Sequence, residues 1–220
     1  MGSLPYGAAR TILKLSATLG LSAGVAAAEP VTILALGDSL TQGYGLAPSD
    51  GFVPQMSRWL EEQGAEVELR NAGVSGDTTA GGLARAEWSL DETVDGMIVA
   101  LGGNDLLRGV DPASSRTNLE GILEIARERE LPVLLVGMEA PSNYGAEFKS
   151  AFDAMYPELS EAYGTLHFPD FLEGISALPD RAQSVERYLQ PDRLHPNAEG
   201  VALIVEAMGP AVLELVEAAD

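Results

Sequence analysis

Two short segments near opposite ends of the chain carry residue types that nucleophilic catalysis needs. Residues 37–40 read Gly-Asp-Ser-Leu, directly after an apolar run, and residues 192–196 read Asp-Arg-Leu-His-Pro, before the last apolar segment. Asp192 stands three residues before His195, and a carboxylate so close can hold an imidazole in one tautomer and orientation. Together with Ser39, this pair predicts a Ser-His-Asp nucleophilic site.

Two further segments offer donors for the oxyanion that such a serine would generate. Gly76 follows the second apolar run and has no side chain to obstruct its backbone N–H. Asn104, within Gly-Gly-Asn-Asp, offers a side-chain amide. Each signal also has an ordinary interpretation, because glycine and asparagine are common in turns and a serine after a strand is often a helix N-cap. Their occurrence at successive strand ends favours a site.

Alternating strands and helices must position these residues. Apolar runs typical of strands occur at 31–36, 67–69, 97–101, 133–138 and 165–168. Helical spacing of apolar residues occurs at 52–60, 81–90, 119–126, 148–163 and 198–216. Near-continuous apolar strands are typical of a parallel sheet covered on both faces, so we expect one three-layer α/β/α domain. Ligands of such sheets lie beyond the carboxyl ends of the strands, where the candidate residues fall.

The first 28 residues resemble a secretory signal peptide. They hold two basic residues and no acidic one, an apolar stretch at 15–25, and Ala-Ala-Ala at 26–28 as a cleavage signal. The alternatives are a helix packed on the domain or a membrane anchor, but a membrane span needs about 20 apolar residues. We expect cleavage after residue 28, a single domain at 29–220 without a stable membrane anchor, and a periplasmic or secreted protein.

Charge and composition exclude several classes of function. The formal net charge of −20 becomes −22 once the two basic residues of the leader are removed. A nucleic-acid-binding surface needs a basic patch, and anionic lipid would repel such a chain, so we expect no nucleic-acid partner. The chain has no cysteine and only two histidines, which argues against a Cys/His zinc site. The acidic surface aids solubility and is compatible with salt tolerance.

The four segments occur in the order of the marker blocks of the SGNH, or GDSL, hydrolase superfamily, which the chain resembles from Val31 to Val216. The closer resemblance is to the bacterial multifunctional thioesterase I/lysophospholipase L1/arylesterase group. The motifs that carry it are Gly-Asp-Ser-Leu-Thr-Gln-Gly-Tyr at 37–44, Ser-Gly-Asp-Thr at 75–78, Leu-Gly-Gly-Asn-Asp at 101–105 and Pro-Ser-Asn-Tyr-Gly at 141–145.

The resemblance implies a flavodoxin-like SGNH hydrolase fold, no metal and no cofactor. It also implies that Ser39 is the nucleophile, His195 the general base and Asp192 the residue that orients His195. The backbone N–H groups of Ser39 and Gly76, with the Asn104 amide, would form the oxyanion hole.

The segment Asp105–Val110 matches a mobile loop beside the acyl pocket of the family. We therefore expect Leu106, Leu107 and Val110 to contact the substrate. The alternative is that Leu106 and Leu107 pack into the core.

Other residues near these motifs have structural interpretations. Asp38 and Asp105 are expected to brace loops, and His167 to be structural within a short strand. Trp59 and Trp88 are expected to be core or half-buried helix residues.

The sequence therefore predicts a secreted serine esterase or thioesterase that acts on small acyl and aryl esters, acyl thioesters or lysophospholipids. Two alternatives stay open: a carbohydrate O-acetylesterase of the same superfamily, and a non-catalytic periplasmic binding module. Aromatic residues, which would form platforms for sugars, are only 6% of the chain, and this favours acyl chains. The sequence does not fix the physiological substrate, the acyl length or the oligomeric state, for which a monomer is the expectation.

Overall fold

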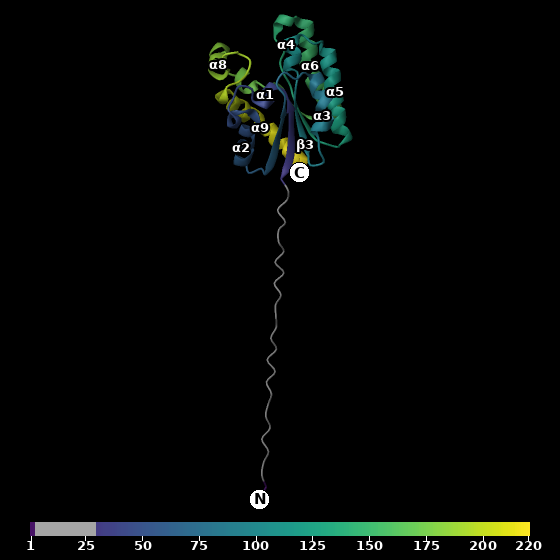
Figure 1. The fold of residues 1–220 in the computed structure, drawn as a ribbon, viewed down its shortest axis with the longest axis vertical. Coiled ribbons are helices and arrows are strands. Elements are labelled where there is room, and N and C mark those ends of the chain that lie inside the picture. Colours follow the sequence, from purple (N-terminus) through teal and green to yellow (C-terminus); the bar gives the residue numbers. More distant parts are fainter. Residues whose placement is uncertain (3–29) are drawn as a thin grey trace.

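A five-stranded parallel sheet with strand order β2-β1-β3-β4-β5 lies at the centre of the protein (Figure 1). The computed structural model describes Met1, Gly2 and residues 30–220, so nearly all of the predicted signal peptide lies outside the described residues. The strands are β1 (Val31–Gly37), β2 (Val67–Gly73), β3 (Gly96–Ala100), β4 (Val133–Val136) and β5 (Leu166–Phe168). This order is that of flavodoxin-like sheets, so the predicted fold class is confirmed.

Helices cover both faces of the sheet. The helices are α1 (Ser39–Gln42), α2 (Phe52–Glu62), α3 (Thr79–Ser89), α4 (Gly103–Arg108), α5 (Pro112–Glu128), α6 (Ala146–Tyr163), α7 (Glu173–Ser176), α8 (Arg181–Tyr188) and α9 (Ala198–Ala219). Short 3₁₀ turns lie at Pro48–Asp50 and Ser142–Tyr144. In Figure 1, α2 and α9 lie on one side of the sheet and α3, α5 and α6 on the other. Within the described residues, no helix has the length and apolar character needed to cross a bilayer.

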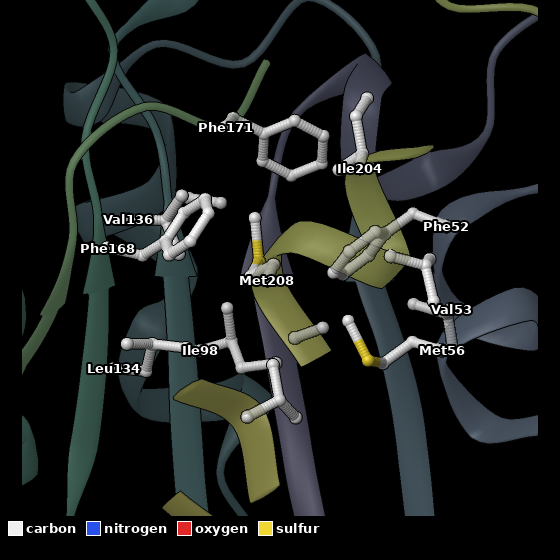
Figure 2. Packing of buried hydrophobic residues seen from close by; sticks show 14 of the residues in the cluster. Phe52, Val53, Met56, Ile98, Leu134, Val136, Phe168, Phe171, Ile204 and Met208 are labelled. Carbon is white, nitrogen blue, oxygen red and sulfur yellow. The ribbon is translucent and has the colours of Figure 1, made fainter. Parts of the chain in front are cut away.

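The two faces of β1 supply two separate cores. Because side chains alternate along a strand, Ile33 and Ala35 pack toward α2 and α9, whereas Leu34 and Leu36 pack toward α3 and α5. Figure 2 shows the first of these cores, where side chains from α2 and α9 meet those of β3, β4 and β5. Labelled there are Phe52, Val53, Met56, Ile98, Leu134, Val136, Phe168, Phe171, Ile204 and Met208. Burial on both faces explains the continuous apolar sequence of the inner strands.

The edge strand β2 is longer than the apolar run at 67–69 that marks it in the sequence. It continues to Gly73 and stays paired with β1 along its whole length. Its later residues Arg70 and Asn71 are polar because this edge of the sheet is partly exposed. An apolar criterion therefore finds only the first half of the strand.

The carboxyl ends of β1, β2 and β3 lie side by side. Gly37 pairs with Gly73 of β2 and with Ala100 of β3. A Cβ atom on Gly73 would lie 2.3 Å from the backbone nitrogen of Gln42, so only glycine permits α1 to sit this close to β2. The boundary between β1 and β3 is the point at which strand order reverses, where open α/β sheets bind their ligands.

Candidate active site

Ser39 is the first residue of α1, directly beyond the end of β1. Asp38 is the N-cap of this helix, because its carboxylate accepts a 3.0 Å hydrogen bond from the backbone N–H of Leu40. Ser39 is therefore not the N-cap, which was the ordinary interpretation of this serine. Its hydroxyl instead lies 2.9 Å from Nε2 of His195.

Asp192 orients His195 from the opposite side of the ring. Nδ1 of His195 lies 2.7 Å from Oδ2 of Asp192, while Oδ1 of Asp192 accepts the backbone N–H groups of Leu194 and His195. The N–H of Leu194, then the imidazole and the N–H of His195, lower the pKa of Asp192 to about 2. Because the carboxylate is ionised at neutral pH, it favours the proton on Nδ1 and leaves Nε2 to accept the Ser39 proton.

The loop that carries these two residues is held against α1. The backbone N–H of Gln190 donates to the carbonyl of His195 at 2.7 Å. The side-chain amide of Gln190 donates to the carbonyls of Tyr44 and Pro196. The Tyr44 ring packs on the imidazole with 4.7 Å between ring centroids. The contacts fix the position of the imidazole relative to α1.

Asn104 and Gly76 follow the ends of β3 and β2, the two strands that pair with β1. Asn104, the second residue of α4, donates from Nδ2 to Oδ2 of Asp38 at 3.1 Å. Gly76 has a φ of +86°, a left-handed conformation that favours glycine, and its carbonyl accepts a 2.7 Å hydrogen bond from Arg108. Ser39, Gly76 and Asn104 thus follow the ends of three adjacent strands, whereas Asp192 and His195 lie in the loop between α8 and α9.

Asp105 braces the elements that carry Asn104 and Gly76, as the sequence predicts. Its buried carboxylate accepts from the backbone N–H and the hydroxyl of Thr79, at the start of α3. It also accepts from the hydroxyl of Ser115 on α5. These bonds tie α4 to the helix that begins three residues after Gly76.

A cavity of about 370 Å³ opens beside Ser39 and His195, within the size range of small-molecule sites. Its other lining residues are Asp38, Leu40, Gly103, Asn104, Leu106, Leu107, Met138, Glu139, Pro141, Asn143, Tyr144, Leu172, Arg181 and Leu194. Apolar side chains thus make up much of the wall next to a serine–histidine pair. Within residues 30–220, no group of three or more His, Asp or Glu residues is placed to hold a metal ion.

The predicted substrate loop Asp105–Val110 is mostly helical in the structure, because α4 extends to Arg108 and ends at Gly109 in the left-handed conformation. Leu106 is buried in the core, as the alternative interpretation expects, and it also lines the cavity. Leu107 is 61% exposed and lines the cavity. Val110 is not among the lining residues.

Several residues of the site carry no signal that marks them in the sequence. Tyr144 lies in the Pro-Ser-Asn-Tyr-Gly motif at 141–145, which does not indicate what its side chain contacts. In the structure its hydroxyl donates to the carbonyl of Leu106 at 2.5 Å, and the residue lines the cavity. Arg181 of α8 and Leu194, next to His195, also line the cavity.

Trp88 is 80% exposed, so its assignment to a buried or half-buried position is wrong. His167 lies half-buried on β5, away from this cavity.

Comparison with known proteins decides the family. The profile of the GDSL-like Lipase/Acylhydrolase family matches residues 35–203, well over half of the chain. The chain belongs to this family.

Members of the family with names and structures support the same assignment. Esterase TesA of Pseudomonas aeruginosa is 35% identical over 92% of the chain and 98% of TesA. Thioesterase 1/protease 1/lysophospholipase L1 of Escherichia coli strain K12 is 32% identical, over 86% of the chain and 87% of that protein. The crystal structure of AlinE4, an SGNH-hydrolase family esterase, is similar with a TM-score of 0.69 and 43% identity over 86% of the chain and 98% of AlinE4. The predicted enzyme class, a carboxylic ester hydrolase, is confirmed.

Proposed function

We propose that this family member hydrolyses acyl and aryl esters and acyl thioesters through a Ser39–His195–Asp192 triad. The observation that carries the proposal is the continuous series of contacts from Ser39 Oγ through both nitrogens of His195 to Asp192, at 2.9 and 2.7 Å. A hydroxyl becomes an effective nucleophile when a base removes its proton during attack, and the base works when a third group orients it.

The reaction follows from this geometry in two stages. Ser39 Oγ attacks the ester carbonyl while Nε2 of His195 takes its proton, which gives a tetrahedral intermediate with a negative oxygen. Nε2 then returns the proton to the leaving alcohol or thiol, and an acyl group stays on Ser39. Water, deprotonated by the same nitrogen, releases the acid and restores the serine.

The negative oxygen of the intermediate would be stabilised by three N–H donors, from the backbone of Ser39, the backbone of Gly76 and the side chain of Asn104. Asn104 gives one amide hydrogen to Asp38 and retains the second for the oxyanion. Donors held in place before reaction stabilise the transition state at little reorganisation cost.

The apolar part of the cavity supports an acyl chain as the group bound beside Ser39. Leu106, Leu107, Met138 and Tyr144 lie on its wall, and burying apolar surface stabilises such a complex by about 25 cal/mol per Å². The name of the relative from Escherichia coli includes thioesterase and lysophospholipase activities, so long acyl thioesters and lysophospholipids belong among the substrates to be tested.

We also propose that residues 1–28 are a signal peptide that is removed on export, leaving 29–220 as the mature enzyme. The basic start, the short apolar stretch and the alanine-rich end of this segment support the proposal.

The test is hydrolysis of p-nitrophenyl acetate, butyrate and octanoate by the wild type and by Ser39→Ala. The substitution should lower kcat by up to about 10⁶-fold, the loss seen when the nucleophile of a triad is removed. A fluorophosphonate probe should label the peptide that contains Ser39. Ser49→Ala, a substitution of an exposed serine, is the matched control and should keep full activity. Full activity in Ser39→Ala, or a label on another serine, would refute the assignment.

A further inference from the structure

The guanidinium of Arg85, in the middle of α3, is hydrogen-bonded to three separate segments of the chain. Nε donates to Oδ2 of Asp77 at 2.6 Å. Nη1 donates to the carbonyl of Ala72 at 2.8 Å, and Nη2 to the carbonyl of Gly37 at 2.9 Å. One planar group thus joins the end of β1, the end of β2 and the loop between β2 and α3.

The positions of these acceptors relate Arg85 to the proposed reaction. Gly37 stands two residues before Ser39, whose N–H is one proposed oxyanion donor. Asp77 directly follows Gly76, whose N–H is another. Arg85 therefore fixes the relative position of two backbone segments that must present their N–H groups to the same oxygen.

The environment of Arg85 gives these contacts little freedom. The side chains of Arg85 and Asp77 are 20% and 19% exposed, so the ion pair is partly shielded from solvent. Guanidinium presents its donors in a rigid planar fork, which a flexible ammonium on lysine cannot reproduce. Because the guanidinium donates to three acceptors at once, the ends of β1 and β2 and the loop between β2 and α3 have few alternative positions relative to one another.

A second arginine is hydrogen-bonded to Gly76 itself. Arg108 of α4 donates to the Gly76 carbonyl at 2.7 Å. The Arg108 side chain is exposed, whereas the Arg85 side chain is only 20% exposed. The Gly76 loop is thus held between α3 and α4, and the less exposed of the two contacts is made by Arg85.

We infer that Arg85 is a positioning residue, which sets the geometry of the oxyanion hole without touching the substrate. The inference rests on the proposed Ser39 mechanism and adds a residue to it. It differs from a purely structural ion pair because two of its three acceptors are carbonyls of strands that lead into the oxyanion donors.

Three variants and one control test the inference. Arg85→Met keeps an unbranched side chain as far as the position of Nε and removes every donor. Arg85→Lys keeps the charge without the fork, and Asp77→Asn weakens one of the three contacts. The control is Arg116→Met. Arg116 bonds Glu120 and Glu158 on α5 and α6, so its loss removes an arginine whose hydrogen bonds do not involve the loop between β2 and α3.

The readouts are kcat, KM and the inhibition constant of an alkylboronic acid, which forms a tetrahedral adduct on a reactive serine. Misplacing a catalytic group by about 1 Å costs about 10²-fold in rate, so Arg85→Met should lower kcat by about 10- to 100-fold. KM should change by less than about threefold, since an oxyanion donor acts mainly in the transition state. The boronic acid should bind more weakly by about the same factor as kcat falls.

Arg85→Lys should recover only a small part of the loss, and Asp77→Asn should lower kcat by severalfold. Arg116→Met should leave kcat and boronic acid binding unchanged, whatever it does to the melting temperature. The downfield proton NMR signal of the His195–Asp192 hydrogen bond should persist in Arg85→Met, which places the defect outside the triad.

Unchanged kcat in folded Arg85→Met, full recovery by lysine, or a rise in KM alone would overturn the inference. If Arg85→Met does not fold, Arg85→Lys and Asp77→Asn decide it by the same measurements. An inactive wild type, or an active Ser39→Ala, would instead refute the proposed mechanism itself, so the two failures are distinguishable.

Discussion

The side-chain amide of Asn104 donates a hydrogen bond to the carboxylate of Asp38 across the boundary between β1 and β3. Asp38 is only 3% exposed and also caps the helix that begins with Ser39. One carboxylate therefore fixes both the proposed nucleophile and a proposed oxyanion donor. Burial raises the pKa of Asp38, partly offset by the hydrogen bonds from Leu40 and Asn104.

Asp38→Asn should separate two effects of the Asp38 carboxylate: the cost of its burial to stability, and its role in holding Asn104 and the helix that begins with Ser39. Between the ordinary pKa of 3.8 and the raised folded pKa, the folded state binds more protons than the unfolded chain. The contribution of Asp38 to stability therefore falls as pH rises through this window. The melting temperature of the variant relative to the wild type should rise over the same window, and kcat should fall because Asn104 loses a charged acceptor. A difference in melting temperature that stays constant with pH would contradict the role of burial.

Asn104→Ala tests the oxyanion donor directly. Removing one such donor typically lowers kcat by about 10² to 10³, about 3–4 kcal/mol of transition-state stabilisation. KM should change much less, and steady-state kinetics with p-nitrophenyl butyrate measures both. A rise in KM with unchanged kcat would show that Asn104 binds the ground state instead.

Asp192→Asn should impair turnover more than folding. An asparagine oxygen can still accept the N–H groups of Leu194 and His195, which Asp192 now accepts, so the loop should keep its shape. The neutral amide no longer stabilises a charged imidazole, and the corresponding change in a serine protease lowers kcat by about 10⁴-fold. Circular dichroism and kcat on one preparation make the comparison. Equal losses of structure and rate would assign Asp192 a structural role.

The pKa of Asp192 is lowered from 3.8 to about 2, so its contribution to stability is complete above pH 3.8 and is lost as pH falls toward 2. Thermal unfolding of the wild type and of Asp192→Asn, above and below pH 3.8, measures this contribution. The difference in melting temperature should be constant above pH 3.8 and should shrink below it; a difference that does not change with pH would contradict the prediction.

Much of the fold could be predicted because the inner strands are buried on both faces and are therefore apolar throughout. β1, β3 and β4 follow this rule, whereas the second half of β2 does not, since Arg70 and Asn71 lie at the edge of the sheet. Helix α4 is only six residues long and has no apolar period to reveal it. Local caps and tertiary contacts stabilise such a helix, and neither is visible in a hydrophobic pattern.

The site was predictable to the extent that its residues lie in recognisable motifs. Ser39 follows β1 within the Gly-Asp-Ser-Leu motif, and His195 lies in the Asp-Arg-Leu-His-Pro motif between α8 and α9. Arg85 and Tyr144 act through contacts with backbone carbonyls of distant segments. Neither their type nor their spacing identifies those acceptors, so only the structure shows the relationship.

The proposed signal peptide predicts a mature N-terminus at Glu29. Cleavage follows small residues at the end of an apolar stretch, as at 26–28. N-terminal sequencing of protein recovered from the periplasm or medium of an expressing bacterium measures this. Exported protein that still carries residues 1–28 would contradict it, and a Lys replacement within the apolar stretch should block export.

Leu107 is the residue through which acyl length should be selected, because its side chain is exposed yet lines the cavity next to Ser39. Burying such a side chain fully contributes about 1.5–3 kcal/mol, of which binding recovers only part. Leu107→Ala should therefore lower kcat/KM for p-nitrophenyl octanoate about fivefold more than for the acetate, about 1 kcal/mol. Stability should change by no more than about 0.5 kcal/mol, since the side chain is at the surface.

Val110→Ala is the matched control for this substitution. Val110 lies three residues further along the same segment but does not line the cavity, so its truncation should leave the octanoate-to-acetate ratio unchanged. A ratio that shifts in Val110→Ala and not in Leu107→Ala would reverse the assignment of the two residues. A ratio unchanged in both would remove this segment from acyl selection, and activity confined to acetate would then favour a carbohydrate O-acetylesterase.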